Sequence, residues 1–119
     1  MTYSDRRQQP RKVASQRIKV RDINTGKPLG EVVNLNSEGL MLVSSDPVEN
    51  NLVFQLELTL KRPHQGASRF ELGAESLWCC TTDEAERFWS GFRIIDVSLD
   101  TIELIESLID SWETDIVKH

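Results

Sequence analysis

Three arginines near the start of the chain have the chemistry to bind an anion and a purine. Arg6, Arg7 and Arg11 lie in a polar segment, and Arg7 and Arg11 have the spacing RxxxR. A guanidinium group keeps its charge near neutral pH, donates paired hydrogen bonds to a phosphate or to the O6 and N7 atoms of guanine, and stacks on a purine face. A lysine would supply only the charge. The segment therefore predicts one half of an anion- and purine-binding site.

A second polar segment, from Asn34 to Gly39, lies between two apolar stretches and has complementary chemistry. Asn34 and Asn36 are expected to project from the same side of a strand, because strand side chains alternate with a period of two. Each amide offers a donor and an acceptor, which suits the edge of a guanine base. Gly39 is expected to permit a β-bulge or a close approach of the backbone to the ligand. Both asparagines are thus expected to hydrogen-bond the ligand.

The two segments together resemble the signature of the PilZ domain family, the bacterial receptor modules for the second messenger cyclic di-GMP (c-di-GMP). The family pattern is RxxxR, then a strand, then [D/N]xSxxG. The chain matches the first part with Arg7 and Arg11. It matches the second part with Asn34, with Asn36 in place of serine, and with Gly39.

A weaker similarity to the family's last strands extends the resemblance over roughly residues 5 to 112. It lies at Ser76 to Trp78 and at Gly91 to Ser98. The resemblance implies a six-stranded antiparallel barrel that binds c-di-GMP, has no catalytic activity and passes the signal to an unidentified downstream protein. Ligand binding is then expected to fold the N-terminal arm against the barrel. An arginine directly before RxxxR, as Arg6 is, is compatible in this family with an intercalated ligand dimer.

The asparagine at position 36 leaves two functions open. Its amide can donate and accept as the family serine does, and a penalty of about 1 kcal/mol at this position would lower the affinity only about five- to tenfold. One function is a PilZ-fold adaptor for protein interaction that binds no nucleotide. The other, which is our first prediction, is a c-di-GMP receptor. Its expected ligand-binding residues are Arg6, Arg7, Arg11, Asn34, Asn36 and Gly39.

Charge and composition narrow the class of ligand and the location. The net charge is -5, while cations gather between Arg6 and Arg21 and acids gather from Asp96 onward. This distribution fits capture of a small anion better than binding of DNA or RNA, which are not expected as partners. The N-terminus has no apolar signal-peptide centre, and no apolar run approaches the roughly 20 residues that span a bilayer. A cytoplasmic protein without membrane insertion is expected.

The pattern along the chain predicts an all-β domain with one helix. Residues 1–13 have no apolar periodicity and predict a flexible arm, and residues 14–119 predict a barrel with a helix at about 100–113. Asp100 with Glu103 is expected to form a capping box at the start of that helix. The expected strands are 17–21, 29–35, 40–43, 54–60, 70–78 and 88–95, with turns at 24–27 and 44–47 and polar loops at 61–68 and 81–87.

Two charged surfaces are expected to face solvent. Arg17, Lys19 and Arg21 share one side of a strand, which favours a solvated face over a contact surface. The acids of the helix, from Glu103 to Glu113, predict its solvent-exposed face. The alternative is that this acidic surface docks a partner.

No enzyme, metal site or cofactor is expected. His64 has no second ligand at a suitable spacing, and the adjacent Cys79 and Cys80 form neither a disulfide framework nor a metal-ligand pattern. The sequence also suggests no nucleophile with an acid–base partner. The tryptophans are expected in the core or at its rim, although an exposed one can anchor a partner; they are Trp78, Trp89 and Trp112.

Overall fold

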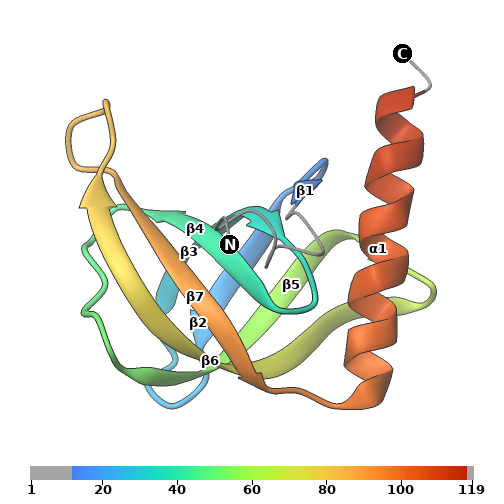
Figure 1. Ribbon diagram of the computed structural model, residues 1–119, viewed down its shortest axis with the longest axis horizontal. Helices are drawn as coiled ribbons and strands as arrows, with labels where there is room; N and C mark the ends of the chain where they lie inside the picture. The colour runs from blue at the N-terminus through green and yellow to red at the C-terminus, as the bar shows by residue number, and fades with distance from the viewer. Residues whose placement is uncertain (1–11, 118–119) are drawn as a thin grey trace, which may run out of the picture.

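The computed structural model describes residues 12–117 of the chain. Within this range the strands form one antiparallel sheet, and one helix follows the last strand (Figure 1). The elements in chain order are β1 (Lys12–Val13), β2 (Ile18–Asp22), β3 (Pro28–Leu35), β4 (Gly39–Ser44), β5 (Val53–His64), β6 (Ala67–Thr81), β7 (Phe88–Asp96) and α1 (Leu99–Val117).

Strands β2 to β7 close into a six-stranded barrel. Neighbours around the ring follow the order β2, β5, β6, β7, β4 and β3, and β3 pairs with β2 to complete it. Closure removes the exposed edges that an open sheet would have. The predicted all-β fold, an antiparallel barrel with a C-terminal helix, is confirmed.

The short strand β1 continues the line of β2 along β3. β2 pairs with the first half of β3, whereas Lys12 and Val13 pair with Leu35 and Asn34 at its end. A bend at residues 15–16 separates β1 from β2. Lys12 and Val13 belong to the arm expected from the sequence, and the rest of that arm lies outside the described residues.

Apolar side chains at alternating strand positions fill the barrel interior. In β5, Leu56, Leu58 and Leu60 are buried while Gln55 and Thr59 are exposed, as a period of two predicts for a strand with one buried face. Helix α1 adds its own apolar face to this core. The core comprises Ile18, Val20, Val32, Leu35, Leu40, Leu42, Val48, Leu56, Leu58, Leu60, Phe70, Leu72, Ala74, Phe92, Ile105, Leu108, Ile109 and Trp112.

The hairpin between β5 and β6 is longer than the sequence pattern predicts. The polar loop expected at 61–68 is wrong, because β5 runs to His64 and β6 starts at Ala67. The turn consists of Gln65 and Gly66, whose φ angles of 51° and 81° are both positive. Two positive φ angles are what a two-residue turn needs to match the right-handed twist of its strands.

Helix α1 is capped by Ser98. The Ser98 Oγ accepts a hydrogen bond from the Thr101 N–H at 3.1 Å, which is the usual arrangement at a helix N-cap. The capping box expected from Asp100 and Glu103 is therefore wrong, because Asp100 already lies inside the helix.

The apolar face of α1 packs on one end of the barrel (Figure 1). Ile105 and Trp112 are at most 1% exposed. The tip of the β5–β6 hairpin also reaches the helix, where Ser107 Oγ lies 2.9 Å from His64 Nε2 and accepts a hydrogen bond from Gln65 Nε2 at 2.8 Å. Among the described residues, no helix has the length and apolar content that a bilayer span requires.

Candidate functional site

A β-bulge in β3 sets the direction of Asn34. Val32 and Asn34 pair with adjacent residues of β4, so Val33 is an extra residue in β3. Such a bulge reverses the face of the sheet that the following side chains occupy. Val32 and Leu35 therefore both lie in the core, and Asn34 faces the outside of the barrel.

The Asn34 side chain has one weak hydrogen bond and one unused acceptor. Its Nδ2 donates to Met41 Sδ at 3.7 Å, whereas its Oδ1 is buried and has no hydrogen-bond partner among the residues that the structure describes. A buried polar atom without a partner costs about 1–3 kcal/mol. Native structures rarely keep such an atom without a reason. Asn34 therefore holds an acceptor on the outer side of the barrel that no described donor uses.

Asn36 shapes the turn between β3 and β4. Its Oδ1 accepts hydrogen bonds from the backbone N–H groups of Glu38 at 2.8 Å and Gly39 at 2.9 Å, which is an Asx-turn. β3 ends at Leu35, so the expectation that Asn34 and Asn36 share one side of a strand is wrong. A direct hydrogen bond from Asn36 to a ligand stays a prediction.

Gly39 is the first residue of β4 and lies in regular register. It is buried and pairs with Arg93 of β7. Its φ angle is not positive, and the bulge expected at this position lies at Val33 instead. Close approach of a ligand to the Gly39 backbone stays a prediction.

The indole of Trp78 lies across the backbone of Gly91 on the outer face. A Cβ atom at Gly91 would collide with the Cε2, Nε1 and Cζ2 atoms of that ring. Gly91 pairs with Met41 of β4, and Met41 pairs with Asn34 of β3. Trp78 is 37% exposed. An aromatic surface and an unused acceptor thus lie in one row across β3, β4, β7 and β6, which we call the Asn34–Trp78 row.

Sequence reasoning did not single out Trp78 as a site residue. A glycine opposite a tryptophan is the signal that could have found it. That pairing depends on a second bulge, between Ser76 and Trp78, which places Trp78 opposite Gly91. The sequence gives no indication of this shift.

A cation, Arg93, borders the Asn34–Trp78 row. It pairs with Gly39 on one side and with Glu75 on the other, and its Nη2 donates to Glu75 Oε1 at 2.5 Å. Its side chain is 62% exposed, and exposed ion pairs contribute only about 0–1 kcal/mol. A phosphate group could therefore take this guanidinium from Glu75 at little cost.

The predicted ligand-binding arginines, Arg6, Arg7 and Arg11, lie outside the described residues. Arg11 directly precedes Lys12 in the chain, and Lys12 pairs with Leu35. The RxxxR segment thus joins the barrel next to the end of β3 that carries Asn34.

A family model described as the PilZ domain matches residues 5–111 of the chain. This match includes every residue that the sequence predicts for the site. No curated protein sequence matches the chain.

Solved structures share the fold at low sequence identity. The PilZ domain of YcgR from Escherichia coli, solved with c-di-GMP, has a TM-score of 0.73 and 13% identity, and the match covers 95% of each chain. MrkH of K. pneumonia in its apo state gives a TM-score of 0.76 and 12% identity, covering 95% of this chain and 52% of that one. The Bacillus subtilis inhibitor of motility MotI/DgrA gives 0.72 and 12%, covering 92% of this chain and 52% of that one. The chain spans about half the length of the MrkH and MotI chains.

Proposed function

Because this chain belongs to the PilZ domain family, we propose that it is a receptor for c-di-GMP and binds the nucleotide on the Asn34–Trp78 row. The observation that carries the proposal is the buried Asn34 Oδ1, which finds no hydrogen-bond partner within residues 12–117. This acceptor lies on the same outer face as an exposed indole, close to the point where the RxxxR segment joins the barrel. The YcgR PilZ domain, which shares the fold, was solved with c-di-GMP, and this supports the ligand class.

Asn34 and Trp78 offer the two kinds of contact that a guanine base needs. The N2 amino group of guanine is a hydrogen-bond donor and suits Asn34 Oδ1. Stacking of a base on an aromatic side chain contributes about 1–3 kcal/mol. One face of the Trp78 indole rests on Gly91, while the residue as a whole is 37% exposed, so the other face of the ring is the one that a base would contact.

The arginines of the N-terminal arm would add the charge that two phosphates require. Arg7 and Arg11 would donate to phosphate oxygens or to guanine O6 and N7 and would stack on the bases. Arg6 would assist them and would allow an intercalated ligand dimer. Binding would fold the arm against the barrel from β1 onward, where pairing with β3 anchors the chain.

Asn36 conserves the local geometry at the position where the chain departs from the family pattern. A serine hydroxyl, like an asparagine amide, accepts hydrogen bonds from backbone N–H groups nearby in the chain. Either residue can therefore hold the turn that leads into β4. This weakens the main argument for the alternative function, a PilZ-fold adaptor that binds no nucleotide.

A receptor of this kind needs no chemical step. The bound nucleotide and the folded arm would together form a new outer surface over β4 and β7. We expect a downstream protein to recognise that combined surface, which exists only when c-di-GMP is bound.

Isothermal titration calorimetry with c-di-GMP tests the proposal, with GTP and cyclic di-AMP as controls. Saturable binding of c-di-GMP alone is expected, and the stoichiometry distinguishes a single ligand from an intercalated dimer. The variant Asn34→Ala is expected to weaken binding about tenfold. The matched control Asn24→Ala, in the exposed β2–β3 turn, should leave the affinity unchanged.

The two parts of the proposal fail in different ways. A chain that binds no c-di-GMP at millimolar ligand is not a receptor, and the adaptor function then stands. A chain that binds c-di-GMP equally well with Asn34→Ala is a receptor whose site lies elsewhere.

A further inference from the structure

A basic hollow lies on the side of the barrel away from the Asn34–Trp78 row. The outer faces of β2 and β5 form it, and in the ring these strands are separated from β4 and β7 by β3 on one side and β6 on the other. The hollow has a volume of about 270 Å³ and is lined by Arg17, Lys19, Thr59, Leu60 and Lys61.

Two cations at the rim of the hollow have no carboxylate partner. Lys19 and Lys61 are exposed, and neither forms an ion pair with a residue that the structure describes. Arg17, by contrast, binds Glu31 Oε2 at 3.0 Å. Leu60 also borders the hollow, but its side chain is buried in the barrel core. The outward-facing lining of the hollow therefore carries positive charge that no described carboxylate neutralises at Lys19 and Lys61.

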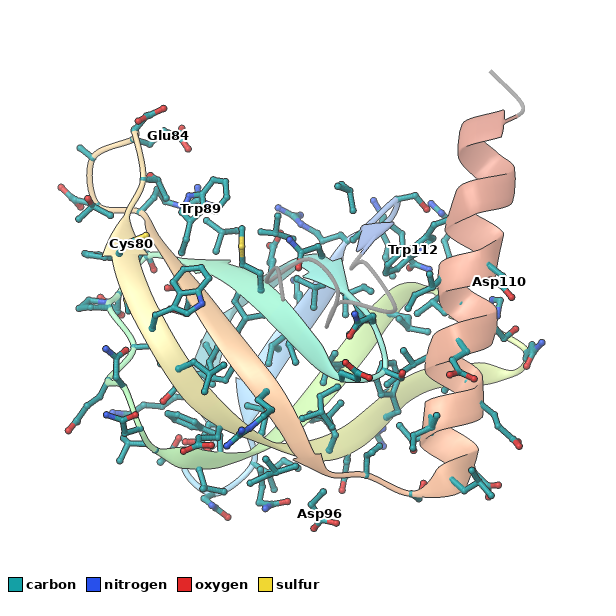
Figure 2. All side chains as sticks on the ribbon, viewed as in Figure 1. Cys80, Glu84, Trp89, Asp96, Asp110 and Trp112 are labelled. Atoms are coloured by element: carbon teal, nitrogen blue, oxygen red, sulfur yellow. The ribbon has the colours of Figure 1, made fainter. Side chains whose placement is uncertain are left out.

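Helix α1 carries a matching stripe on its outer side. Leu99 is 69% exposed, and Glu103, Glu106 and Asp110 are exposed as well. Their spacing of four, three and four residues places them along one face of a helix with about 3.6 residues per turn. Figure 2 shows Trp112 on the barrel side of α1, away from this stripe.

We propose that the Leu99–Asp110 stripe of one copy of this chain docks into the basic hollow of a second copy. Leu99 enters the hollow against the methylene groups of Lys19 and Lys61, and Glu103 and Glu106 pair with the ammonium groups of these lysines. The two acids lie about 5–6 Å apart on the helix, and the two lysines are diagonal neighbours about 7–8 Å apart on the sheet. The long lysine side chains can therefore bring both ammonium groups to the two carboxylates.

The contact joins two different surfaces of the same molecule. It is therefore heterologous, so copies add head to tail into rings or open chains. The net charge of -5 repels two copies at long range, so the contact depends on the local charges and on the leucine anchor. A salt concentration of about 0.1 M limits that repulsion to about 10 Å. The Asn34–Trp78 row stays open, so the contact is independent of the proposed c-di-GMP site.

A charge-exchange experiment on the full chain tests this proposal. Sedimentation velocity at 0.1 M NaCl is expected to show a sedimentation coefficient that rises with protein concentration. The variants Lys19→Glu/Lys61→Glu and Glu103→Lys/Glu106→Lys should each stay monomeric, because like charges then face each other. An equimolar mixture of the two should associate again, since each reversed surface meets an opposite one.

Two further variants complete the design. Leu99→Gln should remove association without changing any charge. Glu84→Lys/Glu86→Lys, a matched reversal in the exposed loop between β6 and β7, should associate like the wild type. Circular dichroism confirms that each variant is folded. A wild type that is monomeric at every concentration, or a mixture of the two reversed variants that stays monomeric, overturns the proposal.

Discussion

The contact between Trp78 and Gly91 gives a direct test of the candidate site, because Gly91→Ala adds one methyl group where an indole lies. The added carbon would collide with three atoms of the ring, Cε2, Nε1 and Cζ2. Extra atoms forced into a packed contact usually destabilise a protein by about 1–3 kcal/mol. Trp78 is 37% exposed, so the ring can swing away from β7. We therefore expect a cost near the lower end, about 1 kcal/mol.

A double-mutant cycle isolates this collision. In the Trp78→Ala background the ring is absent, and Gly91→Ala should be neutral or should stabilise the protein by about 0.5–1 kcal/mol, the usual advantage of alanine over glycine in a strand. Urea unfolding of the four proteins, followed by circular dichroism, measures the difference. An equal cost of Gly91→Ala in both backgrounds would refute the contact.

The same displacement is expected to weaken c-di-GMP binding. A ring that has left β7 no longer offers its face to a base, and the loss of stacking corresponds to about 1–3 kcal/mol, or roughly five- to 150-fold in the dissociation constant. Trp78→Ala removes the ring and therefore gives the largest loss of affinity expected from lost stacking. Calorimetry measures the affinity of both variants for c-di-GMP. Wild-type affinity in both would remove the indole from the site, whatever the unfolding cycle shows.

Three other substitutions test what single polar side chains contribute to the stability of the fold. Asn34→Leu should keep or raise the free energy of unfolding, because it removes a buried acceptor that has no partner in the described part of the chain; a urea midpoint far below that of the wild type would contradict this. Asn36→Ala should cost about 1–3 kcal/mol, since two backbone N–H groups lose their acceptor, and Asn36→Ser should recover much of it; equal urea midpoints for the two variants would rule out the turn as the cause. Ser98→Ala should cost about 1 kcal/mol through loss of the N-cap, seen as a lower melting temperature that Ser98→Asp avoids.

The sequence predicts the barrel wherever a strand has one buried and one exposed face. Leu56, Leu58 and Leu60 show this most clearly, because the core selects every second residue. The end of the β5–β6 hairpin has no such face. Lys61, Arg62 and Pro63 are all exposed, and the register between β5 and β6 is irregular between Thr59 and His64. This part of the hairpin therefore leaves no apolar alternation in the sequence.

The candidate site is visible in the sequence only in part. Spacing places Asn34, Asn36 and Gly39 in one short segment, and in the structure that segment runs from the end of β3 to the first residue of β4. The direction of Asn34 and the position of Trp78 depend on two bulges, each of which shifts the register by one residue. A bulge is set by packing across the whole sheet, so the alternation of apolar and polar residues along one strand cannot reveal it.

The Asn34–Trp78 row also crosses the seam at which β4 pairs with β7. Partners in that seam, such as Gly39 and Arg93, are about 50 residues apart in the chain, whereas β3–β4 and β6–β7 are local hairpins. Long-range pairing must overcome the entropy of loop closure, and it limits the folding rate of β proteins. Asn34 and Met41 on the β3–β4 hairpin therefore stay apart from Gly91 and Trp78 on the β6–β7 hairpin until β4 pairs with β7. A ligand that needs both halves of the row would slow the unfolding of the closed barrel and leave the rate of its formation unchanged.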